Sequence, residues 1–343
     1  MGGGPSTADL ARLQTNVVNL MRENEGLRNA IVEMNQRTLR NHAEAVIAVP
    51  IAVLGFYGIQ RLFSMGDSEE SGEERENQNY LLERPWRKIH LRLTEPLEIK
   101  DDFKRTISEI WPQNDKTLNI LLLGQTGSGK PSFINACATS LERNSRIVNL
   151  AVVGSMQPGS ITIRLESYTL DVEVDLEKRK LPVKLFDCRG LSGEERGVKT
   201  EDIKRICQGN IIAGYEINPM EGIHPDNEMY QENPQEEDKM HCIVYVLAAD
   251  EADFMMTDVK EQLEEIKKTF IQDIPQVILL TKIDRLGIDI TQLFRDRRVK
   301  KRCEEAAELF NFNVNDVFPQ SSYSDEVIPC EYKDMVTLFN LRQ

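Results

Sequence analysis

The seven residues from Gly124 to Lys130, with the sequence GQTGSGK, constrain the fold of this chain more than any other segment. They follow the apolar run Leu118–Leu123 and precede a predicted helix that begins at Ser132. In this context the glycines let main-chain N–H groups turn inward around a phosphate, and the helix N-terminus adds partial positive charge. Lys130 would reach the outer phosphates. The segment therefore predicts a phosphate-binding loop, with an accidental glycine-rich turn as the alternative.

Pro131 departs from this pattern, because a Ser or Thr normally follows the lysine. Proline lacks the hydroxyl that would bind Mg²⁺, and it also lacks a main-chain N–H that would face the phosphates. Ser132 stands one position late and does not by itself restore either group. The sequence thus predicts a phosphate site in which Mg²⁺ binding is in doubt.

A second motif, Asp187-Cys188-Arg189-Gly190, ends a predicted strand at Val183–Phe186. Asp-x-x-Gly places an acid where it orients a metal-bound water and a glycine N–H where it meets a γ-phosphate, so we expect Asp187 to act as an indirect metal ligand through water. The motif alone is weak, and an unrelated turn is the alternative. Leu191 follows it, where Ras-like proteins use Gln to orient the attacking water, so we expect slow or absent hydrolysis.

A third motif, Thr281-Lys282-Ile283-Asp284, ends the predicted strand Val277–Leu280. A carboxylate at Asp284 can accept from the ring N–H and the exocyclic amine of guanine, whereas adenine presents no matching pair of donors. Lys282 would lie along the base plane. Further on, Gln320–Tyr323 is positioned like the short loop that supports the base from its other side, although alone it is an ordinary turn.

These motifs stand where ligands bind in an open α/β sheet, at the ends of short apolar runs that alternate with helical stretches. The further strands are predicted from Ile161 through Val174 and at Ile243–Leu247. The fold class is α/β, a P-loop GTPase-like and mostly parallel sheet with flanking helices, and the expected cofactor is GTP or GDP. The candidate binding residues are Gly124, Gln125, Thr126, Gly127, Ser128, Gly129, Lys130, Ser132, Asp187, Gly190, Thr281, Lys282, Asp284, Ser321 and Ser322. The nearest candidates for a switch hydroxyl are Ser160 and Thr162.

The N-terminal part, residues 1–42, carries apolar residues at heptad spacing over residues 10–34. Asn24 occupies a core position, where a buried amide fixes the register of parallel pairs, so the segment predicts a coiled-coil helix and a homodimer. The alternative is an amphipathic helix that packs on the chain's own core.

Residues 43–63 follow, and fifteen of them, Ala45–Ile59, carry no charge. A bilayer span needs roughly 18 residues or more, so the sequence leaves open a membrane contact through residues 45–63 or a buried helix. Residues 64–80 form an acidic linker, and residues 81–343 form the GTPase-like domain. The first six residues also fit the loose myristoylation pattern at Gly2. The alternative is a flexible glycine-rich segment without such a function.

The net charge of −14 comes from 42 basic and 56 acidic side chains, and it gives no general attraction to a phosphate backbone. No sequence-specific nucleic acid is therefore expected as a partner. Six basic residues do gather within residues 295–302, and we interpret them as a solvated helix face, with anionic lipid, RNA or nuclear import as alternatives. The six cysteines form no C-x-x-C pair and follow no signal peptide, which favours reduced thiols in the cytoplasm.

Three stretches of residues 81–343 resemble the interferon-induced protein 44 and 44-like group: Pro85–Lys88, Leu121–Asn135 and His241–Leu247. The resemblance implies a GTPase-like domain in an interferon-inducible, antiviral, cytoplasmic protein of innate immunity. Pro131 departs from the group's Ser, and the heptad and apolar N-terminal segments are not expected of it. Three functions stay open: a regulatory GTP-binding protein with weak hydrolysis at most, a nucleotide-free pseudo-GTPase scaffold, and a membrane-remodelling GTPase.

Overall fold

The structure is a computed structural model that describes residues 80–87, 96–109, 117–142, 146–153, 164–175, 177–192, 197–218, 220–251, 254–255, 257–270 and 272–343. All of them belong to one compact unit, Gly72–Gln343. The predicted heptad helix, the apolar segment, most of the acidic linker, Gly2, Ser160 and Thr162 lie outside the described residues. Among the described residues, no helix is long and apolar enough to cross a membrane.

Six strands form one mixed sheet in the order β2-β3-β1-β4-β5-β6. Strand β3 pairs in parallel with β1, and β1, β4, β5 and β6 continue the parallel part, while β2 pairs with β3 in the antiparallel direction. The predicted mostly parallel sheet is confirmed. The strands are β1 Leu118–Leu123, β2 Glu166–Val174, β3 Glu177–Asp187, β4 Cys242–Ala248, β5 Gln276–Thr281 and β6 Val317–Pro319.

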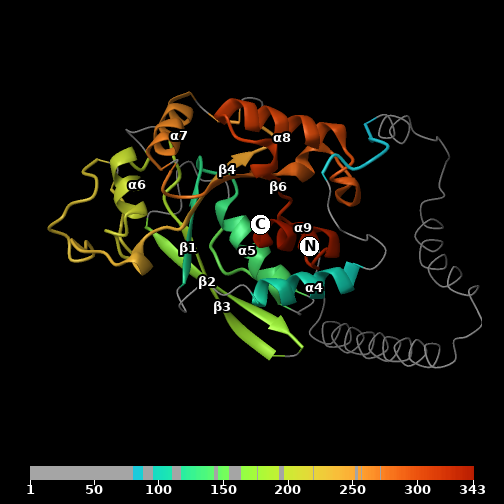
Figure 1. The fold of residues 1–343 in the computed structure, drawn as a ribbon, viewed down its shortest axis with the longest axis horizontal. Coiled ribbons are helices and arrows are strands. Elements are labelled where there is room, and N and C mark those ends of the chain that lie inside the picture. The colour runs from blue at the N-terminus through green and yellow to red at the C-terminus, as the bar shows by residue number, and fades with distance from the viewer. Residues whose placement is uncertain are drawn as a thin grey trace, which may run out of the picture. The chain divides into compact units, whose positions relative to one another are not determined.

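Helices cover both faces of the sheet. This is required because successive side chains of β1 point to opposite faces and both sets are buried. Leu121 and Leu123 pack with residues of α6, α7 and α8, whereas Leu122 packs with residues of α4, α5 and α9. Figure 1 shows the second group of helices lying together. The α-helices are α4 Pro96–Ser108, α5 Lys130–Leu141, α6 Thr200–Cys207, α7 Thr257–Phe270, α8 Arg297–Phe310 and α9 Glu331–Arg342. Short 3₁₀ helices are η1 Glu236–Asp238, η2 Ile283–Leu286, η3 Ile290–Gln292 and η4 Val314–Asp316.

Leu121, Leu122 and Leu123 are completely buried, since β1 lies in the middle of the sheet. Burying a leucine side chain stabilises a fold by roughly 1.5 to 3 kcal/mol, so these three anchor the strand that leads into the phosphate-binding loop. The amphipathic helix predicted around Val259, Leu263, Ile266 and Phe270 is confirmed as α7, with all four side chains buried.

The segment Tyr80–Arg87, which contains most of the Pro-Trp-Arg-Lys cluster, is bound along the start of α8. The N–H groups of Leu82 and Trp86 donate to the main-chain oxygens of Arg295 and Phe294, at 2.8 and 2.9 Å. The Arg87 guanidinium donates to two further carbonyls, those of Val314 and Val317, both at 2.7 Å. This cluster therefore acts as a structural anchor of the domain.

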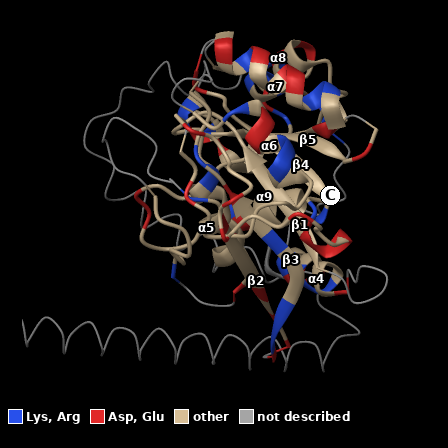
Figure 2. Cartoon of the chain, turned by 90° about the vertical axis from the view of Figure 1, so that its left-hand side faces the viewer, with Lys and Arg blue, Asp and Glu red and all other residues tan. Residues whose placement is uncertain are grey.

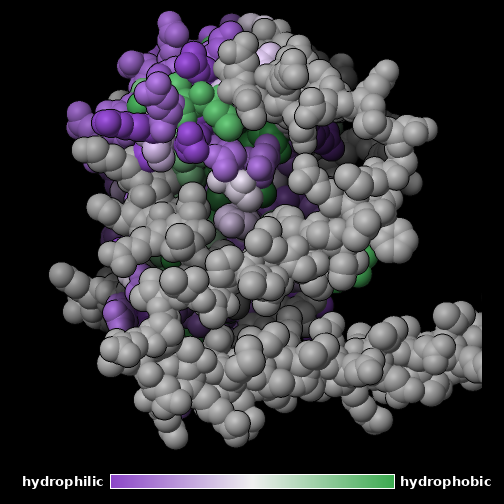
Figure 3. Space-filling view, turned by 90° about the vertical axis from the view of Figure 1, so that its right-hand side faces the viewer, coloured by the Kyte–Doolittle hydropathy of each residue, from purple (hydrophilic) through white to green (hydrophobic). Residues whose placement is uncertain are grey.

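The basic residues of the 295–302 stretch lie largely on α8 and are mostly paired with acids. Lys300 and Lys301 pair with Glu304 and Glu305 at 2.9 and 3.6 Å, one helical turn away. Figure 2 shows basic and acidic residues interspersed on α7 and α8. On the face drawn in Figure 3, hydrophilic residues gather in the upper part of the described region, with apolar areas between them. These pairs agree with a solvated helix face.

All six cysteines are free thiols, as predicted. Four of them, Cys137, Cys188, Cys207 and Cys303, are buried, which makes them part of the core.

Candidate nucleotide site

The phosphate-binding loop leaves the end of β1 and turns directly into α5. Gly127 and Gly129 have φ angles of 82° and 99°, the left-handed region that side chains other than glycine rarely adopt. At Gly124 a Cβ atom would lie 2.3 Å from the main-chain oxygen of Val246 on β4. The three glycines of the motif are thus each required by backbone geometry.

Lys130 is the first residue of α5, and its side chain is buried. Its Nζ donates to the main-chain oxygens of Gly124 at 3.0 Å and Gln125 at 3.3 Å, both within the loop itself. The ammonium group is therefore held against the carbonyls of the loop itself.

Helix α5 begins two residues before the predicted start at Ser132, so that prediction is wrong in its boundary. Pro131 lies in the first turn, where its fixed φ suits the helix and its missing N–H removes no intrahelical hydrogen bond. The helix consequently tolerates Pro131 without distortion. What the substitution changes is the chemistry of the loop, because neither a hydroxyl nor an N–H is present at this position.

The residues present do not fit the usual magnesium site of a P-loop protein, which combines a hydroxyl after the lysine with a carboxylate. Asp187 supplies a buried carboxylate, but Pro131 supplies no ligand. Among the described residues there is also no group of three or more His, Cys, Asp or Glu side chains placed to hold a metal ion.

The Asp187–Gly190 motif follows β3, and its next residue is bonded to the phosphate-binding loop. Leu191 N donates to Gly124 O at 3.0 Å, and Thr126 N donates to Leu191 O at 3.3 Å, which forms a parallel bridge between Gln125 and Leu191. A Cβ atom on Gly190 would lie 2.4 Å from Thr126 Oγ1, so only glycine fits there. The two predicted phosphate elements are brought together.

Leu191 has no exposed surface, and its side chain belongs to the core cluster that α6, α7 and α8 cover. It does not occupy the place of a side chain that would orient water. Cys188 of the same motif is also buried, and burial raises the pKa of its thiol to about 12. This cysteine is therefore a neutral packing residue and not a nucleophile.

Thr281 joins the third motif to the first. Its Oγ1 donates to Ser128 O in the phosphate-binding loop at 2.5 Å and lies 2.9 Å from Leu247 O of β4. Lys282, the next residue, has a positive φ of 58°. Its Nζ lies 3.6 Å from Asp250 Oδ1 and 3.9 Å from Glu251 Oε1.

Asp250 and Glu251 were missed by sequence reasoning, since an acidic pair after a strand is an ordinary surface feature. They follow β4 and face Lys282 and Arg285, whose guanidinium lies 2.8 Å from Asp250 Oδ2. Burial raises the pKa of Glu251, and the charge of Lys282 opposes that shift. The pair holds Lys282 at the edge of the site.

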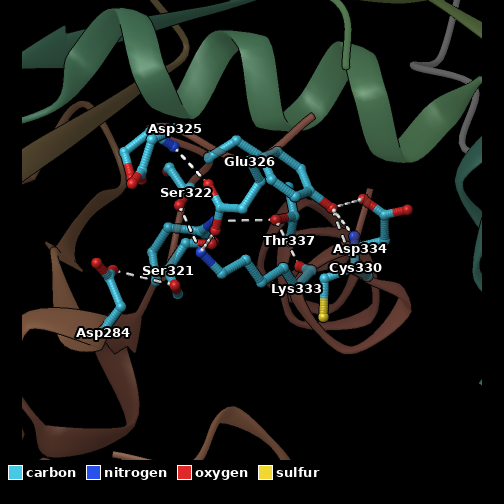
Figure 4. A network of polar contacts seen from close by, with 12 residues as sticks. Asp284, Ser321, Ser322, Asp325, Glu326, Cys330, Lys333, Asp334 and Thr337 are labelled. Carbon is cyan, nitrogen blue, oxygen red and sulfur yellow. Dashed lines mark hydrogen bonds and ion pairs between the residues drawn. The ribbon is translucent and has the colours of Figure 1, made fainter. Parts of the chain in front are cut away.

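Asp284 lies on η2 and is exposed, with its carboxylate held on one side only by the loop after β6. Ser321, which is completely buried, donates from Oγ to Asp284 Oδ1 at 3.0 Å (Figure 4). The predicted base-reading acid and the predicted base-supporting loop are thus neighbours. Ser322 is half-buried beside Ser321, and Ser132 lies within α5.

The sheet order and these four loops define a GTPase-like class of P-loop α/β domain. No protein-family model matches the chain. Curated proteins that it resembles are named interferon-induced protein 44 and interferon-induced protein 44-like, which confirms the resemblance predicted from sequence.

The human interferon-induced protein 44 is 29% identical over 231 residues, 66% of this chain and 51% of that protein. The human 44-like protein is 28% identical over 232 residues, 66% of this chain and 50% of that protein. The chain therefore spans about half the length of the curated relatives it matches. Among solved structures, an Era variant of Aquifex aeolicus bound to GDP and AlF4⁻ matches with a TM-score of 0.34 and 14% identity, over 60% of this chain and 51% of that chain.

Proposed function

We propose that this chain is a guanine-nucleotide-binding regulatory protein with slow or absent GTP hydrolysis. The observation that carries the proposal is the position of Asp284, exposed on η2 shortly after β5, with one oxygen fixed by Ser321. The adjacent Thr281 is bonded to the phosphate-binding loop, so the base and phosphate ends share one frame. A carboxylate held in this way matches the two donors of guanine and repels the acceptor at the same edge of adenine.

Slow hydrolysis follows from two residues. The buried Leu191 presents no polar group to an attacking water, and Pro131 offers no ligand to a magnesium ion that would stabilise the transition-state charge. Chemistry at the γ-phosphate would then depend on positioning alone. A binding protein that changes state with its nucleotide fits these residues better than an efficient enzyme does.

The biological setting we propose is the interferon-induced innate immune response, including antiviral defence. The names of the curated relatives support this setting. We place the protein in the cytoplasm, in line with its free and mostly buried thiols. Two partners are proposed from the sequence of the N-terminal segments: a second copy of the chain through residues 10–34 and a membrane surface through residues 45–63.

A nucleotide-free scaffold is the second candidate, and one arrangement favours it. Lys130 Nζ is bonded to the loop carbonyls of Gly124 and Gln125, and Thr126 N is bonded to Leu191 O. Two donors that a phosphate would use are therefore engaged within the protein. A phosphate must compete with these contacts, which a permanently empty loop could retain.

A calorimetric titration of the full chain with GDP, GTP and ADP, with and without Mg²⁺, separates the two candidates. We expect GDP and GTP to bind and ADP to bind at least tenfold more weakly. Lys130→Met should weaken both guanine nucleotides, while the matched exposed variant Lys268→Met should not. An absence of binding by all three nucleotides would leave the scaffold as the function.

A further inference from the structure

The loop that supports Asp284 is held from behind by the C-terminal helix α9, through a polar network that the site motifs do not include (Figure 4). We infer that Lys333 and Asp334 of α9 are positioning residues for base selection. They fix the loop Gln320–Tyr323, which in turn fixes the carboxylate of Asp284. This inference rests on the proposed binding of a guanine nucleotide and adds the part of the protein that sets its selectivity.

The first link is the contact between Ser321 and Asp284. Asp284 is exposed on a short 3₁₀ helix, where a carboxylate would otherwise rotate freely. The hydrogen bond of 3.0 Å from Ser321 Oγ fixes one of its oxygens. Ser321 can do so only while its own main chain stays in place, because a serine side chain is short. The direction of Asp284 therefore depends on the loop.

Lys333 fixes the loop at the next residue. Its Nζ donates to Ser322 O at 3.0 Å and forms an ion pair with Glu326. Only 9% of Lys333 is exposed, so this ammonium group is committed to the two contacts. Glu326 also accepts from Ser324 N at 2.8 Å. Although burial opposes ionisation of Glu326, the hydrogen bonds from Lys333 and Ser324 lower its pKa to about 2.

Asp334 fixes the end of the loop and is itself completely buried. Its Oδ1 accepts from the Tyr323 hydroxyl at 2.7 Å, and its Oδ2 pairs with Lys100 of α4. The Tyr323 hydroxyl also accepts from Cys330 N at 3.0 Å. A buried carboxylate with two strong partners has one low-energy orientation, so Tyr323 is held in one place.

Gln320, the first residue of the loop, is held by α9 as well. Its side-chain amide donates to Thr337 Oγ1 at 2.9 Å and accepts from Asn340 Nδ2 at 2.9 Å. Its main-chain oxygen accepts from Ile283 N, next to Asp284, at 3.4 Å. Each of the four loop residues thus has a contact that keeps it in position.

A rigid support matters for selectivity more than for general affinity. A site distinguishes guanine from adenine because its acceptors are fixed where guanine has donors, and a carboxylate that turns aside loses this distinction. The phosphate contacts lie in the loop after β1, and none of the hydrogen bonds described above for Gln320–Tyr323 is made to that loop. Loosening the network should therefore weaken guanine nucleotides selectively and leave phosphate binding unchanged.

The test measures the dissociation constants of GDP, ADP and inorganic pyrophosphate for the full chain and for Lys333→Met, Tyr323→Phe and Lys333→Arg. In Lys333→Met and Tyr323→Phe we expect the preference for GDP over ADP to fall about tenfold, with pyrophosphate affinity within twofold of the native value. Lys333→Arg should recover most of the preference. Lys268→Met, an exposed lysine on α7, is the matched control.

A variant that is merely destabilised lowers the affinity of all three ligands by one factor and leaves their ratio unchanged. An unchanged ratio in both Lys333→Met and Tyr323→Phe would overturn the positioning role while leaving guanine-nucleotide binding intact. A native chain that binds pyrophosphate but shows no preference for GDP over ADP would overturn the proposed function itself, and this inference with it.

Discussion

The hydroxyl of Thr281 donates a hydrogen bond of 2.5 Å to the main-chain oxygen of Ser128, across 153 residues of sequence. Its side chain also packs against Gly129, where an added Cβ would lie 3.4 Å from Thr281 Oγ1. Thr281, the last residue of β5, therefore contacts the phosphate-binding loop. It stands three positions before Asp284, the acid that we propose reads the guanine base. In the proposed nucleotide site, Thr281 would fix the separation between the loop that holds the phosphates and the residues that read the base.

Thr281→Val keeps the shape of this side chain and removes its hydroxyl. The buried oxygens of Ser128 and Leu247 would each lose a contact, which should cost about 1 to 3 kcal/mol of unfolding free energy and weaken GDP. Urea denaturation and GDP titration measure the two effects. Thr269→Val, at an exposed position of α7, is the control. Equal losses of stability and GDP affinity in both variants would argue against a specific role for the contact between Thr281 and the phosphate-binding loop.

The buried Lys104 should make the free energy of unfolding depend on pH. Only 2% of it is exposed, its Nζ donates to Glu142 O at the end of α5, and burial, aided by Lys100, lowers its pKa to about 8. Between pH 8 and 10.5 the unfolded chain binds more protons at this lysine than the folded chain does. Stability from this group therefore rises with pH across that window, by at most about 1.4 kcal/mol per pH unit.

The measurement is the difference in unfolding free energy between the native chain and Lys104→Met, taken at several pH values. We expect this difference to shift in favour of the native chain as pH rises from 8 to 10.5, and to be constant below pH 7. Using the difference removes the contribution of buried cysteines such as Cys137, whose raised pKa acts in the opposite direction. A difference that does not vary with pH would show that the pKa of Lys104 is not lowered in the folded chain.

Asn24 carries the prediction for assembly, which rests on sequence alone. A peptide spanning Ser6 to Arg40 should form a parallel helical dimer, since the heptad seam is apolar at most core positions. Asn24→Leu should raise its melting temperature and broaden its distribution of oligomers. Circular dichroism and analytical ultracentrifugation provide the readouts, and a monomeric, unfolded native peptide at high concentration would refute the dimer.

Much of the sheet was predictable, because strands in a parallel sheet are short apolar runs that stand out between helices. The predicted Leu118–Leu123 agrees with β1 residue by residue, and Val277–Leu280 falls one residue short of β5 at each end. The edge strand β6, of only three residues, has too little pattern to be seen. Helix α4 was not predicted, although its buried residues Phe103 and Ile107 pack with residues of α5 and α9.

In the site, too, some features could be predicted from the sequence and others could not. Motifs such as Gly124–Lys130 are visible because their chemistry demands fixed spacing within a few residues. Contacts such as that between Lys333 and Ser322 join ordinary residues on separate elements, and nothing in the local sequence marks them. Pro131 was recognised as a departure, yet its easy accommodation in the first turn of α5 became evident only from the helix start.

Pro131→Ser should restore the missing ligand. Magnesium normally bridges the β- and γ-phosphates through this hydroxyl, so native GTP binding should depend little on Mg²⁺. The variant should bind Mg-GTP about ten- to hundredfold more tightly, the range expected for one charged hydrogen bond, and hydrolyse it faster. Titrations and phosphate-release assays with and without Mg²⁺ measure both. Brisk Mg²⁺-dependent hydrolysis by the native chain, not improved in the variant, would mean that another residue holds the metal.

Asp284→Asn tests whether Asp284 reads a guanine base, as the proposed function requires. Xanthine carries a carbonyl where guanine carries its exocyclic amine, so an amide at this position presents a donor where xanthine has an acceptor. We predict that the native chain prefers GDP to xanthosine diphosphate and that Asp284→Asn reverses this preference, with GDP affinity falling by about ten- to hundredfold. Asp289→Asn, an exposed acid five residues further on, serves as the control. If the variant keeps the native preference in competition titrations, Asp284 does not contact the base and this site does not select guanine.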